Sequence, residues 1–489
     1  MHHKLVLVLV FLTPIFSKEK IHYSHSGYFT AATIHRLSDG SIIKIPYRIL
    51  SYEPVLSFNN FNIVANTALE FRLKDIDKIM ESDLTPDLRE LYVEWISPIG
   101  DFSLGKQIIT WGTASENNPT DNISPYNYYY LFSIGKERKE GIFSLNSTFY
   151  YQNLKLNAIF IPEHNPNTLP LNDTEFPISI PIEDPSTNKP LTITNEQIME
   201  LKEPLEYGIS ITYPFTSLDI SASYFSGYDR IVSFFGANVW SNQAFTNIIA
   251  DTVLSYRKTD VYGLGFSALL EDFTVRVDFG YFDTDDNIQD KNKLYREYEF
   301  GKQDIIQDCR AYNADLPIWA TDTLDCINEP VVKEILQLNN SAKYYEYNFE
   351  IEYNPNSEFR LIMQLSQQHS IKFGKADSLT LSVDTILLDP SKLFIAGMGS
   401  PNTFISTNAL SITAQKLFSD IGLELRYTSM FDLDEKGSLH GVGIEYELFR
   451  NTNLLIELTK IFDNEEIQSN PFTGMKDFSR ILVGLNYYY

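Results

Sequence analysis

The chain has 489 residues, a net charge of −25 and a mean hydropathy of −0.18. The acidic balance excludes nucleic acid as a partner, because nucleic-acid binding requires a basic surface. No apolar run reaches the roughly 18 residues that a membrane-spanning helix requires. The chain nevertheless contains 30 Tyr and 33 Phe, many of them spaced two apart. This composition favours a β-barrel, in which only every second residue must face lipid.

The N-terminus predicts export. Residues 2–4 form a short basic opening, and residues 5–16 form an apolar run. This arrangement is typical of a secretory signal peptide, here residues 1–17, which is removed from the mature protein. Residues 18–489 then form a single domain.

Segments of alternating apolar and polar residues recur along the rest of the chain, and each predicts a β-strand. Eighteen such segments give an even number, which places both termini on the same side of a bacterial barrel. Sixteen is the alternative, because the first two segments are the least clear. The predicted strands are 27–37, 43–57, 60–74, 88–97, 102–112, 141–152, 154–162, 205–215, 218–231, 253–270, 272–285, 342–353, 358–371, 404–418, 420–433, 438–449, 452–463 and 478–489.

The connections alternate in length, as in an all-β, antiparallel transmembrane barrel. Tight turns would lie in the periplasm, and long loops rich in Pro, Asn and Asp would lie outside the cell. The expected long loops are 113–140, 163–204, 232–252, 286–341, 372–403 and 464–477.

The alternation also assigns charged residues to the lumen. A charge facing lipid at mid-membrane costs about 2–4 kcal/mol for Lys or Arg, and less for an acid, so these side chains are expected to point inward. They would either form salt bridges that hold the wall or line a pore that favours cations. The candidates are Glu70, Arg72, Glu90, Glu94, Arg276, Asp278, Glu346, Glu350, Glu352, Arg360, Glu424, Arg426, Glu445, Glu447 and Glu457.

The loop 113–140 combines acids and bases. Glu116 and Asp121 precede a basic run at Lys136, Arg138 and Lys139. Folded into the barrel mouth, such a loop would narrow the pore. The alternative is an outward loop with a solvated charge run, preceded by Trp111 as a residue of the aromatic girdle.

Residues 88–170 carry a more specific pattern. It comprises LRELYV at 88–93, GKQ at 105–107, WG at 111–112, PTD at 119–121, SPYNY at 124–128 and IP at 161–162. It resembles a poorly characterised family of proteobacterial outer-membrane barrels related in style to alginate-export porins. Lys106, Ser124 and Asn127 replace the Arg, Asn and Asp of that family pattern. The resemblance implies an outer-membrane channel or transport role, without a settled substrate.

The last strand ends on aromatic residues. Gly484, Tyr487 and Tyr489 form a G-x-x-aromatic-x-aromatic arrangement. This resembles the terminal signal that the bacterial barrel-assembly machinery recognises. Assembly machinery and outer-membrane lipid are therefore expected partners.

Other chemistry is sparse. Cys309 and Cys326 lie in one long loop, where they form a disulfide after export or remain as two free thiols. No cofactor motif is present, and the acidic run 283–290 departs from the EF-hand spacing. His369, close to Ser366 and Ser370, is the candidate for a hydrolytic site.

The expectation is therefore a channel in the outer membrane of a diderm bacterium, for small solutes or for export of a secreted product. The alternatives are a surface barrel whose long loops bind a partner and, third, an outer-membrane hydrolase. The solute and the oligomeric state stay open.

Overall fold

A computed structural model of the chain describes residues 21–76, 79–133, 135–171, 173–176, 198–199, 201, 204–241, 248–285, 310–311, 313–314, 332–375, 377–380, 385–463 and 471–489. The predicted signal peptide and the Cys309–Cys326 pair lie outside these residues.

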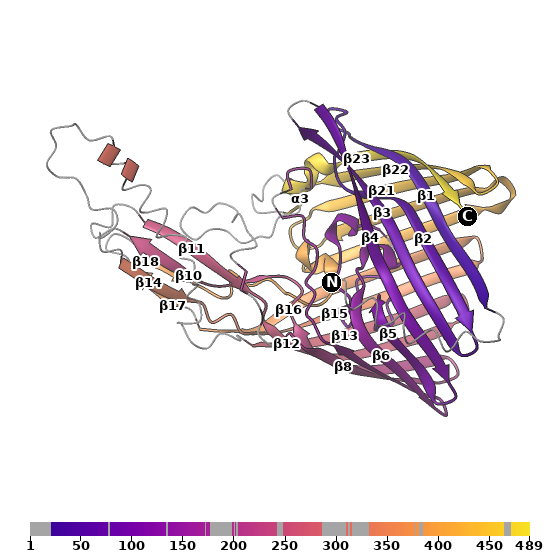
Figure 1. Ribbon diagram of the computed structural model, residues 1–489, viewed down its shortest axis with the longest axis horizontal. Coiled ribbons are helices and arrows are strands. Elements are labelled where there is room, and N and C mark those ends of the chain that lie inside the picture. The colour runs from indigo at the N-terminus through magenta and orange to yellow at the C-terminus, as the bar shows by residue number, and fades with distance from the viewer. Residues whose placement is uncertain are drawn as a thin grey trace.

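Eighteen antiparallel strands form one closed sheet (Figure 1). Each strand pairs with its neighbours in chain order, and the last strand pairs with the first, so that Gly484 lies opposite Ala32. The prediction of eighteen strands is confirmed, and sixteen is wrong. The strands of the barrel are β1 (His22–Arg36), β2 (Tyr47–Phe58), β3 (Phe61–Ile76), β4 (Ile79–Ser97), β5 (Gly100–Gln107), β6 (Ile142–Tyr151), β7 (Leu154–Ile161), β8 (Glu206–Pro214), β9 (Leu218–Tyr228), β12 (Lys258–Leu270), β13 (Phe273–Asp285), β15 (Ala342–Asn356), β16 (Phe359–Phe373), β19 (Asn408–Phe418), β20 (Leu423–Asp432), β21 (Ser438–Phe449), β22 (Thr452–Phe462) and β23 (Arg480–Tyr488).

The two ends of the barrel differ. At the turn end, short connections join the strands, and the C-terminus lies there (Figure 1). Asn59, Gln152, Glu271 and Asn451 take left-handed backbone conformations in these turns. Short polar residues such as Asn tolerate that conformation best. The other end, the loop end, carries the long connections.

Smaller elements lie within the long connections. β10 (Ser233–Ser241), β11 (Ile248–Ser255) and β14 (Val332–Gln337) form a separate three-stranded sheet. β17 (Asp377–Thr380) pairs with β18 (Thr385–Leu388). A short helix, α3 (Pro471–Met475), precedes β23. None of the helices within the described ranges is both long enough and apolar enough to cross a membrane.

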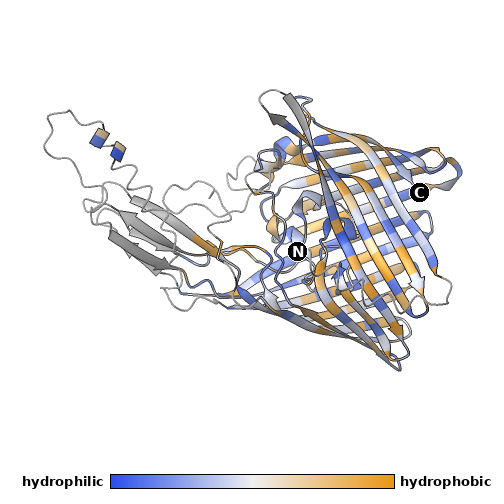
Figure 2. Cartoon of the chain, in the orientation of Figure 1, coloured by the Kyte–Doolittle hydropathy of each residue, from blue (hydrophilic) through white to orange (hydrophobic). Residues whose placement is uncertain are grey.

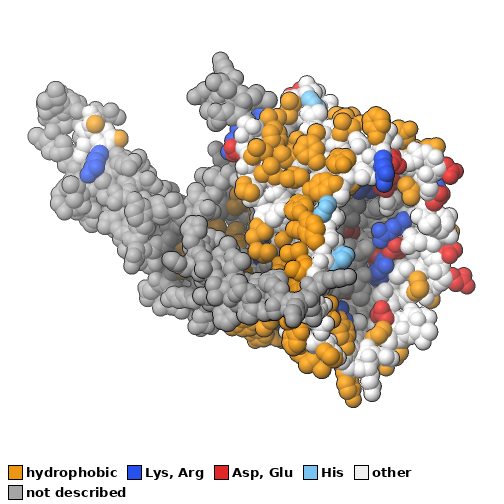
Figure 3. All heavy atoms as spheres, turned by 45° about the vertical axis from the view of Figure 1, so that its right-hand side comes forward, with side chains coloured by type: hydrophobic (Ala, Val, Ile, Leu, Met, Phe, Trp, Pro, Cys, Tyr) orange, Lys and Arg blue, Asp and Glu red, His pale blue; other side chains and the backbone are white. Residues whose placement is uncertain are grey.

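The strands have an apolar outer face. Hydrophobic and hydrophilic residues alternate along them (Figure 2), and the outer surface is a broad apolar field (Figure 3). Exposed side chains on this face include Leu264, Phe266, Val442 and Leu485. Large apolar side chains exposed in this number would be unfavourable in water, so the surface is suited to hydrocarbon.

Two rows of aromatic rings border this apolar field. Near the loop end, neighbouring strands bring Tyr207, Tyr224, Tyr262 and Tyr281 within 5.3–6.4 Å of one another. Near the turn end, the row comprises Phe58, Phe61, Trp95, Phe102 and Phe149, with ring centroids 5.3–6.3 Å apart. These rows match the aromatic girdles that mark both interfaces of a membrane barrel.

The spacing of the two rows fits a membrane. On β13, Tyr281 and Phe273 are eight residues apart and lie in opposite rows; Phe273 stacks on Tyr353. Eight residues span about 27 Å along a strand. At a tilt of about 40°, this corresponds to about 21 Å of height, close to the roughly 25 Å apolar band of such barrels.

Several predicted boundaries are wrong for identifiable reasons. The second strand begins at Tyr47 rather than at residue 43, because Pro46 has no N–H to donate to a ladder. The third strand continues to Ile76 and the fourth begins at Ile79, so both are longer than predicted, since strands beyond the membrane need no apolar face. Residues 253–255, expected to begin the strand 253–270, belong instead to β11.

The apolar band predicts a depth-dependent cost of charge. Phe266 lies halfway along β12, between the two aromatic rows, and Leu270 ends that strand at the turn end. Phe266→Arg should lower the free energy of unfolding by about 2–4 kcal/mol, and Leu270→Arg by about 0–1 kcal/mol. Denaturant titration in lipid vesicles would measure both, and equal costs at the two positions would contradict the assigned membrane boundaries.

Candidate functional site

Residues 108–141, which connect β5 to β6, form an inward loop. This loop makes hydrogen bonds to two parts of the barrel wall. One part comprises β2 and β4, and the other comprises β13, β15 and β16. A segment that reaches opposite walls of a closed barrel must cross its interior. Of the two placements that the sequence leaves open for 113–140, the structure has the inward one.

Acidic wall residues hold one side of the inward loop. On β13, Asp278 accepts hydrogen bonds from the backbone N–H of Thr113 at 3.0 Å and of Ala114 at 2.6 Å. On β15, Glu350 accepts from the backbone N–H and hydroxyl of Ser115, at 3.0 and 2.7 Å. Both acids are fully buried. Hydrogen bonds to carboxylates are strong in such surroundings, so these acids fix the position of the loop.

Side-chain amides of the wall hold the next residues of the loop, 116 and 117. The side-chain nitrogen of Asn348 donates to the carbonyl of Asn117 at 2.7 Å, and that of Gln364 donates to the carbonyl of Glu116 at 2.9 Å. Buried carbonyl groups need such donors, because an unpaired polar group inside a protein is costly. The wall of β15 and β16 is therefore complementary to this stretch of backbone.

Basic wall residues hold the other side. Arg48 on β2 and Arg89 on β4 are buried, and both bind Glu137 of the inward loop, at 2.8 and 3.1 Å. Arg48 also lies over the ring of Tyr130, 3.8 Å from its centroid. The hydroxyl of Tyr130 donates to Glu70 on β3 at 2.7 Å. The loop is thus anchored through an acid of its own on this wall.

A β-bulge brings Arg89 into this cluster. In the pairing of β3 with β4, Asn66 lies opposite Glu90, whereas the next residue, Thr67, lies opposite Leu88. Arg89 is therefore an extra residue in its strand. Arg89 and Glu90 are both buried, although adjacent strand residues normally face opposite sides. A strict two-residue period could not predict that Arg89 faces inward.

Internal contacts shape the inward loop. Gly112 has a φ of +96°, and a Cβ there would lie 1.9 Å from the amide nitrogen of Asn118. Asp121 accepts from the backbone N–H of Trp111 at 3.2 Å and binds Lys139 at 2.5 Å. Residues of the family-like pattern, WG and PTD, therefore maintain the fold of this loop.

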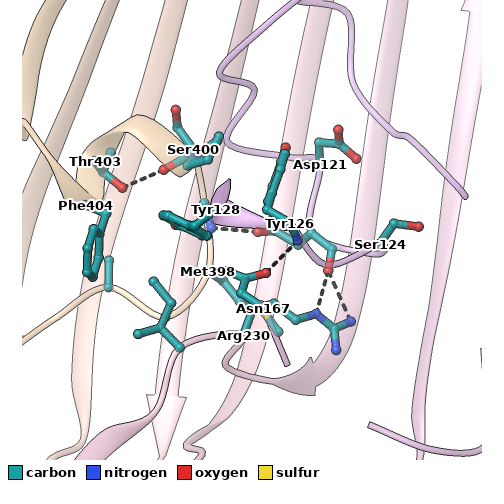
Figure 4. A pocket seen from close by; sticks show the side chains of 16 residues that line it. Asp121, Ser124, Tyr126, Tyr128, Asn167, Arg230, Met398, Ser400, Thr403 and Phe404 are labelled. Atoms are coloured by element: carbon teal, nitrogen blue, oxygen red, sulfur yellow. Dashed lines mark hydrogen bonds between the residues drawn. The ribbon is translucent and has the colours of Figure 1, made fainter. Parts of the chain in front are cut away.

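Three long connections meet above the inward loop (Figure 4). Arg230, which follows β9, donates to the carbonyl of Ile123 at 2.9 Å and to Glu206 at 2.7 Å. The backbone N–H of Tyr126 donates to Asn167, and that of Ser400 donates to Glu346. The remaining cavity among these residues is about 20 Å³, room for about one water molecule. The loop end is therefore closed at this point.

Burial dominates the electrostatics of these connections. It lowers the pKa of the Lys139 ammonium, although Asp121 opposes the shift. It also lowers the pKa of His164, although a hydrogen bond to Glu206 opposes that shift. Burial and a hydrogen bond to Asp173 raise the pKa of Tyr129 to about 12. Removing a charged partner here would leave a desolvated charge, which is costly.

Two larger cavities flank the inward loop. One, of about 610 Å³, opens toward the turn end and is lined by Glu94, Lys155, Asp219 and neighbouring residues of β4 to β9. The other, of about 220 Å³, lies between the loop and the wall formed by β16 and β19 to β23. We call this second cavity the lateral passage. Its lining residues extend from Arg360 near the turn end to Arg480 at the loop end.

The predicted interior residues fall into four groups, three defined by their contacts and one by position. Those in or against the inward loop are Glu70, Glu90, Glu116, Asp121, Asp278 and Glu350. Those bonded to other long connections are Arg72, with Asp173, and Glu346, with Ser400. Those that pair along the wall are Arg276 and Arg360 with Glu352, and Arg426 with Glu457. Those near the turn end are Glu94, Glu424, Glu445 and Glu447.

The structure contradicts two other interpretations of the sequence. Trp111 is not a girdle residue: its indole nitrogen donates to Asn157 at 2.9 Å inside the barrel. His369 packs against Tyr345 on the outer face, and Ser366 and Ser370 differ from it by odd numbers of positions. Side chains of alternate residues point to opposite faces, so His369 forms no constellation with these serines. The residues that sequence reasoning missed are Arg48, Arg89, Glu137 and Arg480.

The chain is only weakly similar to known proteins, in sequence and in structure. No family model matches the chain, and no curated protein matches its sequence. Among solved structures, OccAB1 of Acinetobacter baumannii has a TM-score of 0.44 at 8% identity, covering 96% of this chain and 95% of that one. The outer membrane protein opdK of Pseudomonas aeruginosa has a TM-score of 0.42 at 7% identity, covering 96% and 99%. OmpT, an outer membrane protein of Vibrio cholerae, has a TM-score of 0.38 at 9% identity, covering 97% and 99%. At such values, the likeness carries no inference about this chain.

The contacts of Glu137 predict a loss of stability. Glu137→Gln removes the charge that compensates Arg48 and Arg89, so the free energy of unfolding should fall by about 2 kcal/mol. The inward loop should also become accessible to protease added to barrels in detergent. Glu163→Gln, which removes an exposed acid from another long connection, is the matched control. Unchanged stability and protease resistance in Glu137→Gln would contradict the proposed anchoring.

Proposed function

We propose that the protein is a channel of the bacterial outer membrane that lets small solutes pass along the lateral passage. The apolar outer face between two aromatic rows supports a membrane location. Closed barrels with this exterior are characteristic of the outer membrane of diderm bacteria. The last strand, with Gly484 and Tyr487, pairs with both β1 and β22, which suits a terminal segment that guides closure of the barrel by the assembly machinery.

The observation that carries the proposal is the position of the lateral passage. Inward positions on the strands that border it hold small side chains, such as Ser411, Thr413 and Thr428. On β21, two inward positions are Gly441 and Gly443. A Cβ on Gly443 would meet only ordinary contacts, at 3.5 Å or more from Arg426. Small side chains at these inward positions therefore leave space between this wall and the inward loop.

The size of the lateral passage limits what can cross. About 220 Å³ is far less than an open eighteen-strand barrel would enclose. The inward loop therefore restricts transport to small solutes, and export of a large product would require the loop to move. For this reason we favour passage of small solutes over export of a secreted product.

The alternatives have less support. The loop 286–341, proposed to bind a partner on a surface barrel, lies largely outside the described residues. A hydrolase would need converging catalytic side chains, and the only sequence candidate, His369, faces outward beside Tyr345.

Blocking the lateral passage should block the channel. Gly443→Phe would place a ring in the passage and should lower single-channel conductance in planar bilayers several-fold. The neighbouring substitution Val442→Phe is the matched control, since Val442 lies on the outer face, and its conductance should equal that of the unmodified protein. Absence of conductance from the unmodified, refolded protein would overturn the channel proposal. Equal conductance of Gly443→Phe and Val442→Phe would overturn the route.

A further inference from the structure

The lining of the lateral passage carries more positive than negative charge, in a chain whose net charge is −25. Its ionised side chains are four arginines, at 138, 360, 426 and 480, against two glutamates, at 116 and 457. This excess runs opposite to the acidic, cation-favouring pore that the sequence predicts. Two acids of that prediction, Asp278 and Glu350, bind the inward loop and do not line the passage.

Three of the four arginines have acidic partners, and their ion pairs differ in distance and in exposure to solvent. Arg138 binds Glu116 within the inward loop. Arg360 binds Glu352 at 2.6 Å. Arg426 reaches Glu457 only at 3.6 Å, and both side chains are about one-third exposed. A long, partly hydrated pair is weak, so Arg426 retains much of its attraction for a passing anion.

Arg480 differs from the other three. Its Nη1 nitrogen is buried and has no hydrogen-bond partner among the described residues, and no described acid lies within ion-pair distance of it. The guanidinium lies 4.3 Å from the ring centroid of Phe478 and 5.9 Å from that of Phe132. Ring faces stabilise a cation without neutralising it. Arg480 therefore keeps a positive charge without an ion-pair partner among the described residues at the loop end of the passage; Glu457 acts on it from beyond ion-pair distance.

The acids near the turn end do not cancel this charge. Glu424, Glu445 and Glu447 point inward on β20 and β21 but lie outside the lining of the lateral passage. Glu445 already accepts hydrogen bonds from Asn453 at 2.7 Å and from Tyr488 at 3.1 Å. At the wide mouth, water and salt screen such charges within about 10 Å at 0.1 M. Selectivity is set where the passage is narrow.

On the basis of the proposed channel function, we infer that the lateral passage selects small anions and that Arg480 is the residue that attracts them. Arg480 acts through its charge, which no hydrogen bond to Nη1 offsets among the described residues, and Arg426 provides a second positive position along the same wall. Cations meet this excess positive charge at close range and are disfavoured.

The test is the reversal potential of single channels in a tenfold KCl gradient whose dilute side is about 0.1 M, where salt screens charges at the mouth beyond about 10 Å. The unmodified protein should favour chloride over potassium. Arg480→Gln should lower the ratio of chloride to potassium permeability at least fivefold, because one unit charge at about 4 Å in water changes the affinity for each of the two ions about fivefold, in opposite directions. Arg480→Lys, which keeps the charge, should retain most of the preference.

Arg450→Gln is the matched control, because it removes the same charge from the exposed turn between β21 and β22, and its reversal potential should not change. Should Arg480→Gln fail to insert, Arg426→Gln gives the same test with a shift in the same direction. A conducting protein that favours potassium, or that keeps its selectivity in these passage variants, would overturn the inference and leave the channel proposal standing. A protein without conductance would overturn the channel proposal and with it this inference.

Discussion

The hydrogen bonds between the inward loop and the two walls of the barrel are the constraint on which the interior depends. A loop buried inside a barrel loses water from its backbone, and each unpaired N–H or carbonyl group would be costly. Asp278 and Glu350 satisfy the N–H groups on one wall, and Asn348 satisfies carbonyl groups beside them. The pair Arg48 and Glu137 fixes the opposite wall. Without this complementarity, the loop would be more stable in solvent, and the lumen would be open.

The contacts between charged wall residues and the inward loop determine which charged side chains a solute can still reach. Acids that bind the inward loop are not available to contact a solute. The number of inward carboxylates therefore does not predict the charge along the permeation path. The lateral passage lies along β19 to β22, where inward positions such as Thr413 and Gly443 are small. Arginines dominate the charge there. A strongly acidic protein can therefore hold a narrow passage with positive lining, because net charge is a sum over the surface and selectivity is a local property.

The barrel was predictable because its physical cause is local. Lipid on one side and water on the other impose a two-residue period on nearly every strand. Prediction failed where other forces act. A bulge turns Arg89 inward, Pro46 delays β2, and β5 ends at Gln107 because the following backbone leaves the wall to bind Glu90 and Ser124. The inward face of Glu350 could be predicted, but its partner, 235 residues away, could not.

The crossing of the lumen can be tested most directly by a chemical cross-link between the inward loop and the far wall. In a chain with Cys309 and Cys326 replaced by serine, Asn117→Cys and Gln364→Cys replace two residues whose terminal amide atoms lie 3.2 Å apart. Treatment of membrane-inserted protein with a short bifunctional maleimide should give a cross-linked species with altered electrophoretic mobility, as should the adjacent wall pair Asn348→Cys with Ser366→Cys. Cross-linking of the wall pair without cross-linking of the loop pair would contradict a loop held across the barrel.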